Sequence, residues 1–257
     1  MLPVAAQTYQ QNVKAVVEAL ADDSLGRAER LIQETLLLDP SKESNAILYR
    51  YLGEICQRQG RSEAAIEAYG KGLALMPGST ELLLSRASLY LQRNDEARAL
   101  ADYNEVLSLS PDNEEALFFR AYVFARQRRN KEARADYDRL LELDKMNEDA
   151  RLGLAVLNAK DNRPHEALEQ FGSLILLFPT HARHYLARCE FYTGRKEYEK
   201  AMQDAKKAVE LEPENPDCYI TRGLLYKAMK RKNAVRQDCR TAIRLGATLE
   251  QIAPLLD

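Results

Sequence analysis

Residues 80–111 read TELLLSRASLYLQRNDEARALADYNEVLSLSP, and the same pattern returns 34 residues later as EEALFFRAYVFARQRRNKEARADYDRLLELDK, from residue 114. Further copies start at residues 46, 148, 182 and 216. A period of roughly 20–50 residues is typical of repeat architectures, in which each unit buries its apolar face against its neighbours. The sequence therefore predicts a stack of repeated units.

Each unit of 34 residues carries two apolar stripes with helical spacing. Counted from the starts above, the stripes lie at positions 4, 8 and 11 and at positions 20, 24 and 27. The pattern breaks near positions 14–16, and the second helix ends before position 32, where proline stops a helix. Two antiparallel helices folded about this break cross closely at positions 8 and 20. Small residues occupy both positions, as in the pairs Gly53 and Ala65, Ala87 and Ala99, Ala121 and Ala133, Ala155 and Ala167, and Cys189 and Ala201.

Aromatic residues complete the pattern at positions 11 and 24, for example Tyr90 and Tyr103. This arrangement resembles the tetratricopeptide repeat, with its small residue, aromatic residue, alanine, aromatic residue and proline in register. The resemblance implies an all-α, right-handed α-solenoid of about seven helix-turn-helix repeats with a short C-terminal capping helix. It further implies a non-enzymatic scaffold or adaptor that binds a partner peptide or helix in its concave groove.

We expect one solenoid domain over residues 1–257, with a degenerate first repeat at 9–45 and a cap at 247–257. Leu249, Ile252, Leu255 and Leu256 give the cap an apolar face, and a docking tail is the alternative. Met1–Gln7 is either an ordinary helix start or the end of a secretion signal. The second reading would imply a periplasmic or secreted protein, whereas the scattered cysteines favour a reducing, cytoplasmic compartment. The sequence contains no stretch long and apolar enough to span a membrane.

The formal net charge is only −2, but basic residues gather in the turns between the two helices of repeats four and seven. These turns suggest an alternative function, binding of nucleic acid or another anionic surface. Their cations are not interleaved with aromatic residues as a stacking platform requires, and the chain is not basic overall, so nucleic acid is the weaker hypothesis. The basic residues are Arg126, Arg128, Arg129 and Lys131, and Lys227, Lys230, Arg231 and Lys232.

A second charge pattern lies inside the repeats. Four repeats have arginine at position 7 and aspartate at position 23, and the two repeats without that arginine also lack the aspartate. Positions 7 and 23 face each other across the helix pair, so we predict structural ion pairs. The pairs are Arg86 and Asp102, Arg120 and Asp136, Arg188 and Asp204, and Arg222 and Asp238.

In the family that the chain resembles, positions 2, 5, 9, 12 and 13 of the first helix line the groove. Carried over to this sequence, these positions predict an apolar floor centred on Phe118 and Tyr122, although packing against the neighbouring helix is an equal explanation for Leu84 and Leu186. The family's clamp for chaperone C-termini is not matched. The predicted groove residues are Leu84, Phe118, Tyr122, Arg126, Leu152, Val156, Leu186 and Glu190.

Residues with catalytic chemistry are sparse. His181 and His184 are three residues apart at a turn, but no third ligand is evident in the sequence, so we expect no metal site. The four cysteines have no CxxC spacing and are expected to behave as small buried hydrophobes. We therefore expect no catalytic residue, no cofactor and an unidentified protein or peptide as the partner; the sequence does not determine the oligomeric state.

Overall fold

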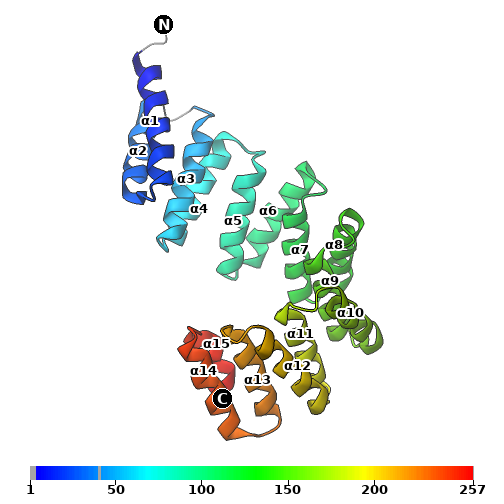
Figure 1. The fold of residues 1–257 in the computed structure, drawn as a ribbon. Coiled ribbons are helices and arrows are strands. Elements are labelled where there is room, and N and C mark those ends of the chain that lie inside the picture. The colour runs from blue at the N-terminus through cyan, green and yellow to red at the C-terminus, as the bar shows by residue number, and fades with distance from the viewer. Residues whose placement is uncertain (1–3, 40–41, 257) are drawn as a thin grey trace. The chain divides into compact units, whose positions relative to one another are not determined.

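The computed structural model describes residues 4–39 and 42–256, and this part of the chain is helical throughout, without a strand. Met1–Pro3 of the leader-like stretch, Pro40 and the last residue of the expected cap, Asp257, lie outside the described residues. The helices are α1 (Val4–Ala21), α2 (Leu25–Leu38), α3 (Asn45–Arg58), α4 (Ser62–Leu75), α5 (Thr80–Gln92), α6 (Glu96–Leu109), α7 (Glu114–Arg126), α8 (Asn130–Leu143), α9 (Glu148–Lys160), α10 (Pro164–Leu177), α11 (Ala182–Gly194), α12 (Tyr198–Leu211), α13 (Pro216–Ala228), α14 (Lys232–Arg244) and α15 (Leu249–Leu256) (Figure 1).

The helices follow the predicted repeats closely. Each repeat forms two helices, and from the second repeat onward the first helix begins within one residue of the predicted start. The all-helical, helix-turn-helix architecture is thereby confirmed. The chain divides into two compact units, residues 1–123 and 124–257, which are described separately below. The single domain and the right-handed sense of the solenoid stay predictions.

A left-handed backbone conformation closes the turn inside every repeat. The residue at position 15 has a positive φ. The residue that follows it, at position 16, donates its backbone N–H back to the first helix, as Asp95 does to the Tyr90 carbonyl at 2.8 Å. Glycine and asparagine tolerate this conformation, whereas for other residues it costs about 1–2 kcal/mol of conformational free energy. Some repeats nevertheless use a long cation here. The residues with a positive φ at position 15 are Asp23, Gly60, Asn94, Arg128, Asn162, Lys196 and Lys230.

In unit 1, residues 1–123, the degenerate first repeat packs onto the second. Val16 and Ile32 are fully buried against Leu48 and Ile55 of α3. Inside the second repeat, a Cβ built on Gly53 would lie 2.2 Å from the Tyr69 ring, which is itself fully buried. The glycine therefore permits the close crossing of α3 and α4 that the small residue at position 8 predicts.

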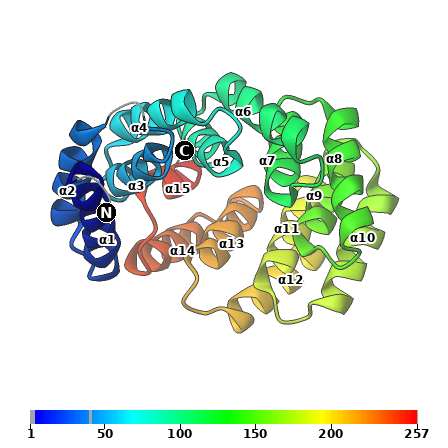
Figure 2. The same cartoon turned by 90° about the horizontal axis from the view of Figure 1, so that it is seen from above.

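In unit 2, residues 124–257, the first helices of neighbouring repeats lie side by side. Figure 2 shows α9 next to α11, with α10 beside α9. At the C-terminal end of the unit, α15 covers α13 and α14, as Figure 1 shows, and buries Ile252 and Leu255 against the last repeat. The prediction that Leu249 and Leu256 share this buried face is wrong, because their side chains are 79% and 66% exposed. An eight-residue helix presents only a narrow stripe to its neighbours, so it buries only these two.

The residue before each first helix, position 34, caps that helix in most repeats. A side-chain oxygen accepts a hydrogen bond from a backbone N–H in the first turn, which satisfies one of the free donors there. The capping residues are Ser79, Asn113, Asn147 and Asn215. His181 stands at the same position before α11, and its side chain forms no cap.

Candidate functional site

Three of the four predicted ion pairs are in direct contact. In each pair the guanidinium donates two hydrogen bonds, one to each carboxylate oxygen, at 2.7–2.9 Å. The aspartates are 2–6% exposed, and the hydrogen bond to aspartate raises the pKa of each arginine against the opposing effect of burial. These are Arg86 with Asp102, Arg188 with Asp204, and Arg222 with Asp238.

The fourth predicted pair divides between the two units. Arg120 lies in unit 1, where it donates a hydrogen bond to Asn104 at 2.9 Å, and Asp136 lies buried in unit 2. This pair stays a prediction.

Repeat five replaces the ion pair with an amide network. Asn158 is 2% exposed and stands where the other repeats mostly have an aromatic residue. Its amide donates to the Gln170 side chain at 2.8 Å, and its carbonyl accepts from Arg134 at 2.7 Å. A buried amide needs such partners, because leaving it without hydrogen bonds would lower the stability of the fold by about 1–3 kcal/mol.

The groove residues of unit 1 form a partly exposed apolar surface. Leu84 and Phe118 are half-buried, and the Phe118 ring packs edge-on against Phe119 at 5.3 Å between centroids. Tyr122 is 43% exposed, which is high for a large aromatic residue. Phe118 and Tyr122 lie one turn apart on α7 and therefore face the same side.

The groove residues of unit 2 divide between packing and an open cavity. Val156 and Glu190 line one cavity of about 390 Å³, whereas Leu152 packs against the buried cluster around Phe171. Leu186 packs against the cluster around Tyr185, and Arg126 is exposed. The structure thus brings two of these predicted residues together in one cavity. The other cavity residues include Ala159, Lys160, Phe171, Ala187, Phe191 and Arg195.

The cavity holds charges of both signs. Its concave walls limit access of water, which raises the pKa of the Glu190 carboxyl, while the positive charge of Lys160 opposes this effect. The side chain itself is still exposed. The sequence did not point to Phe191, which occupies position 10, one residue before the usual aromatic position.

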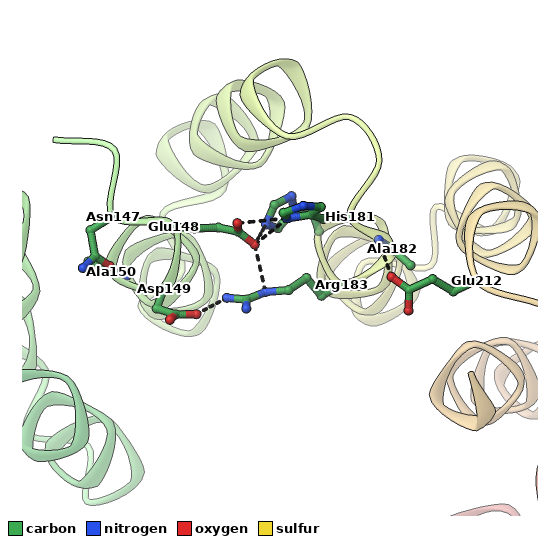
Figure 3. A network of polar contacts seen from close by, with 9 residues as sticks. Asn147, Glu148, Asp149, Ala150, His181, Ala182, Arg183 and Glu212 are labelled. Carbon is green, nitrogen blue, oxygen red and sulfur yellow. Dashed lines mark hydrogen bonds and ion pairs between the residues drawn. The ribbon is translucent and has the colours of Figure 1, made fainter. Parts of the chain in front are cut away.

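A polar cluster joins the N-terminal ends of α9 and α11. His181 Nδ1 lies 2.9 and 3.0 Å from the two carboxylate oxygens of Glu148, and His184 Nε2 lies 2.9 Å from Oε1. Arg183 contacts the same oxygen at 3.3 Å and also pairs with Asp149, as Figure 3 shows. Glu148 is the third potential ligand that the sequence did not reveal, because it lies 33 residues before His181.

The thiols contribute no reactive group among the described residues. All four cysteines are free and buried. Burial raises the pKa of Cys189 to about 12 and that of Cys218 to about 11. Both side chains therefore remain protonated at neutral pH and act as packing residues.

Some cations of the basic turns have intramolecular roles. Arg129 pairs with Glu132 at 3.0 Å and lies over the Phe124 ring at 4.2 Å. Lys227 donates to the Pro254 carbonyl at 2.7 Å and so ties α13 to the cap. The pairing of Arg129 with Glu132 reduces the positive charge that this turn offers to a ligand, and the bond from Lys227 holds that cation against the cap.

The fold defines the class of protein: a stack of paired antiparallel helices with a partly apolar surface along the first helices. The chain belongs to the tetratricopeptide repeat family, and models of this repeat match residues 46–79, 84–147, 126–176 and 185–215. Proteins of this fold are generally protein-interaction scaffolds. A sequence comparison with curated proteins finds no significant match.

Solved structures show the same fold. A tetratricopeptide repeat protein from Parabacteroides merdae ATCC 43184 is 26% identical, with a TM-score of 0.89 over 98% of this chain and 100% of that one. YrrB, described as a TPR protein with an unusual peptide-binding site, is 20% identical with a TM-score of 0.55, over 73% of this chain and 95% of its own. PilW, a type IV pilus biogenesis factor, is 17% identical with a TM-score of 0.65, over 82% of this chain and 98% of its own.

Within the described part of the chain, no helix combines the length and apolar character needed to cross a membrane.

Proposed function

We propose that the chain is a non-enzymatic scaffold that binds a partner peptide or helix along the first helices of its repeats. The observation that carries the proposal is the cavity of about 390 Å³ at Val156, Lys160 and Glu190, which opens on α9 and α11. A concave site with an apolar wall and a few convergent polar groups is the usual form of a binding pocket. Membership of a family of interaction scaffolds agrees with this role.

The cavity chemistry favours an amphipathic ligand. Val156, Phe171 and Phe191 offer an apolar wall, and Lys160, Glu190 and Arg195 place charges of both signs around it. We therefore propose a peptide with one large apolar anchor and flanking charges. The surface of Phe118 and Tyr122 in unit 1 is proposed as a second apolar contact, because aromatic anchors carry most of the affinity at interfaces.

A peptide library displayed on phage and selected against the full chain tests this function. Selected peptides are then measured against two variants, Val156→Asp and Phe118→Ala with Tyr122→Ala. Loss of an anchor typically removes at least about 2 kcal/mol, or about 30-fold in affinity. The matched control is Leu176→Ala on α10, because that side chain is 82% exposed and lies outside the cavity.

Each result has a defined meaning. Loss of binding in Val156→Asp, with Leu176→Ala unchanged and helicity retained, supports the cavity as the peptide site. Unchanged affinity in both groove variants contradicts the proposal. Affinity that instead falls steeply with salt and with Arg128→Ala and Lys230→Ala would assign binding to the basic turns, the alternative hypothesis.

A further inference from the structure

The cluster of Glu148, His181 and His184 has the composition of a metal site. One ligand atom from each side chain lies within 4.8 Å of the others. The three residues come from neighbouring repeats, Glu148 from the start of α9 and the histidines from the start of α11. Two imidazole nitrogens and one carboxylate oxygen are a donor set that zinc uses in proteins.

Both histidines replace residues that serve the fold better elsewhere in the chain. At position 34 the other repeats described above use serine or asparagine as a helix cap, but His181 forms no cap and directs Nδ1 to Glu148. A missing cap costs about 0.5–2 kcal/mol in the fold, so His181 is a costly choice on structural grounds alone.

His184 is a polar residue at an apolar position. Position 3 is fully buried in every repeat from the second onward, and the other repeats fill it with Leu48, Leu82, Ala116, Ala150 and Cys218. His184 is 0% exposed, and within the described residues neither of its ring nitrogens has a hydrogen-bond partner of acceptable geometry. The short distance from Nε2 to Glu148 is thus a close approach in poor alignment. A buried polar group without a partner needs a physical explanation, and a bound ion is one of those available.

We propose that Glu148, His181 and His184 bind one Zn²⁺ ion and so link repeats five and six. Zinc–nitrogen and zinc–oxygen bonds of about 2.0–2.2 Å set tetrahedral ligands about 3.4 Å apart, so the contacts of about 2.9 Å would open slightly to admit the ion. The His181 side chain is 48% exposed, which leaves a fourth coordination position open to water. Arg183 holds Glu148 from outside and fixes its orientation.

Local positive potential sets the expected affinity. The cation of Arg183 and the N-terminal ends of α9 and α11 all disfavour a second cation. We therefore expect micromolar rather than nanomolar affinity for zinc. The full chain, free of affinity tag and stripped with chelator, is titrated with ZnCl₂ by calorimetry, and Co²⁺ is added separately for its visible absorption. The site predicts one zinc per chain, a cobalt spectrum without a thiolate charge-transfer band, and a higher thermal midpoint with zinc.

Two variants copy other repeats of the same chain and should therefore fold. His181→Asn restores the cap that Asn113 and Asn147 form, and His184→Ala restores the alanine of repeats four and five. We expect His181→Asn to raise the thermal midpoint of the metal-free protein and to weaken zinc binding at least about 100-fold, the upper end of the loss seen on removing an outer-shell partner. His165→Asn, the exposed third histidine, is the matched control and should bind zinc like the wild type.

Equal zinc affinity in His181→Asn, His184→Ala and the wild type would overturn the proposal. So would a thiolate band in the cobalt spectrum, because it would assign the metal to the cysteines. Absence of binding to the folded wild type at 1 mM ZnCl₂, about 10³-fold above micromolar affinity, would overturn it as well. None of these results depends on peptide binding, so the two proposals fail independently.

Discussion

Replacement of Arg86 by leucine is the sharpest test of the buried ion pairs. Asp102 is 6% exposed and accepts both of its hydrogen bonds from Arg86 at 2.7 and 2.8 Å. Without the guanidinium, this carboxylate would be left almost without water or a partner. Breaking a buried pair costs about 3–5 kcal/mol and breaking an exposed one up to about 1 kcal/mol. The Arg86 side chain is 23% exposed, so we expect an intermediate loss of about 2–3 kcal/mol in the free energy of unfolding.

The other two variants of the double-mutant cycle separate the effect of losing the ion pair from the effect of changed side-chain packing. Asp102→Ala lets the arginine turn towards solvent and should cost only about 1 kcal/mol. The double variant Arg86→Leu with Asp102→Ala reproduces Leu52 and Ala68, the natural combination of repeat two. Replacing a whole buried pair by apolar residues is often neutral, so we expect the double variant to recover most of the loss.

Hydrogen-exchange mass spectrometry of α5 and α6 measures the effect in unit 1 itself, with urea titration of the whole chain as a second readout. The exposed pair of Arg98 and Asp95 is the matched control, since the Arg98 side chain is 63% exposed and its loss should change stability by less than about 1 kcal/mol. If Arg86→Leu is as stable as the wild type, or if the double variant loses the sum of the two single losses, the pair is no more than a surface contact.

Three further predictions concern single residues. Tyr103→Phe should raise the free energy of unfolding by about 1 kcal/mol, because the buried hydroxyl has no partner within the described residues. Tyr69→Phe should lower the free energy of unfolding, because that hydroxyl donates a hydrogen bond to Gln57 at 3.2 Å. Chemical denaturation compares the two variants. Gly60→Ala should cost about 1–2 kcal/mol in the same assay because φ is +73° there, and Gly78→Ala, which has open space and no positive φ, should be neutral. Glu190→Gln should raise the thermal midpoint at pH 7 but not at pH 4. A carboxyl whose pKa is raised in the folded protein ionises more readily in the unfolded chain. Its unfavourable contribution to folding therefore appears only as the pH rises above the ordinary carboxyl pKa of 4.5. An equal difference at both pH values would assign the effect to packing, and Lys160 and Arg195 are the charged groups that share this cavity.

The helices could be predicted from sequence because two independent signals agree. The apolar stripes fix which face is buried, and the breaks at positions 14–16 and 32 fix where each helix ends. The pairing of position 7 with position 23 followed from the hairpin geometry and from the occurrence of arginine and aspartate in the same four repeats. Three such pairs are in contact in the structure, and each joins residues only 16 apart within one helix pair.

Contacts between repeats were harder to predict. Glu148 meets His181 across 33 residues, and no pattern in the sequence marks a glutamate at position 1 as a partner of position 34. The left-handed turns were also hidden, since lysine or arginine fills position 15 in three repeats, against the usual preference for glycine or asparagine. Leu249 shows a third limit, because apolar spacing alone does not tell which side of a short terminal helix meets the core.

Comparing equivalent positions of the repeats sets a standard, because residues that depart from the shared pattern are candidates for a role beyond packing. α9 departs from that standard at two positions, with Leu154 in place of arginine and the polar Asn158 in place of an aromatic residue, whereas α3 fills the same two positions with the apolar Leu52 and Cys56. A polar cavity of about 420 Å³ lies along Leu154 and Asn158, the cavity of about 390 Å³ lies along Val156 and Lys160, and Glu148 begins the helix. A residue that only supports the stack would be expected to follow the repeat. The residues that leave the pattern here surround open space or a ligand-like cluster, so α9 and its neighbour α11 are where binding should first be sought.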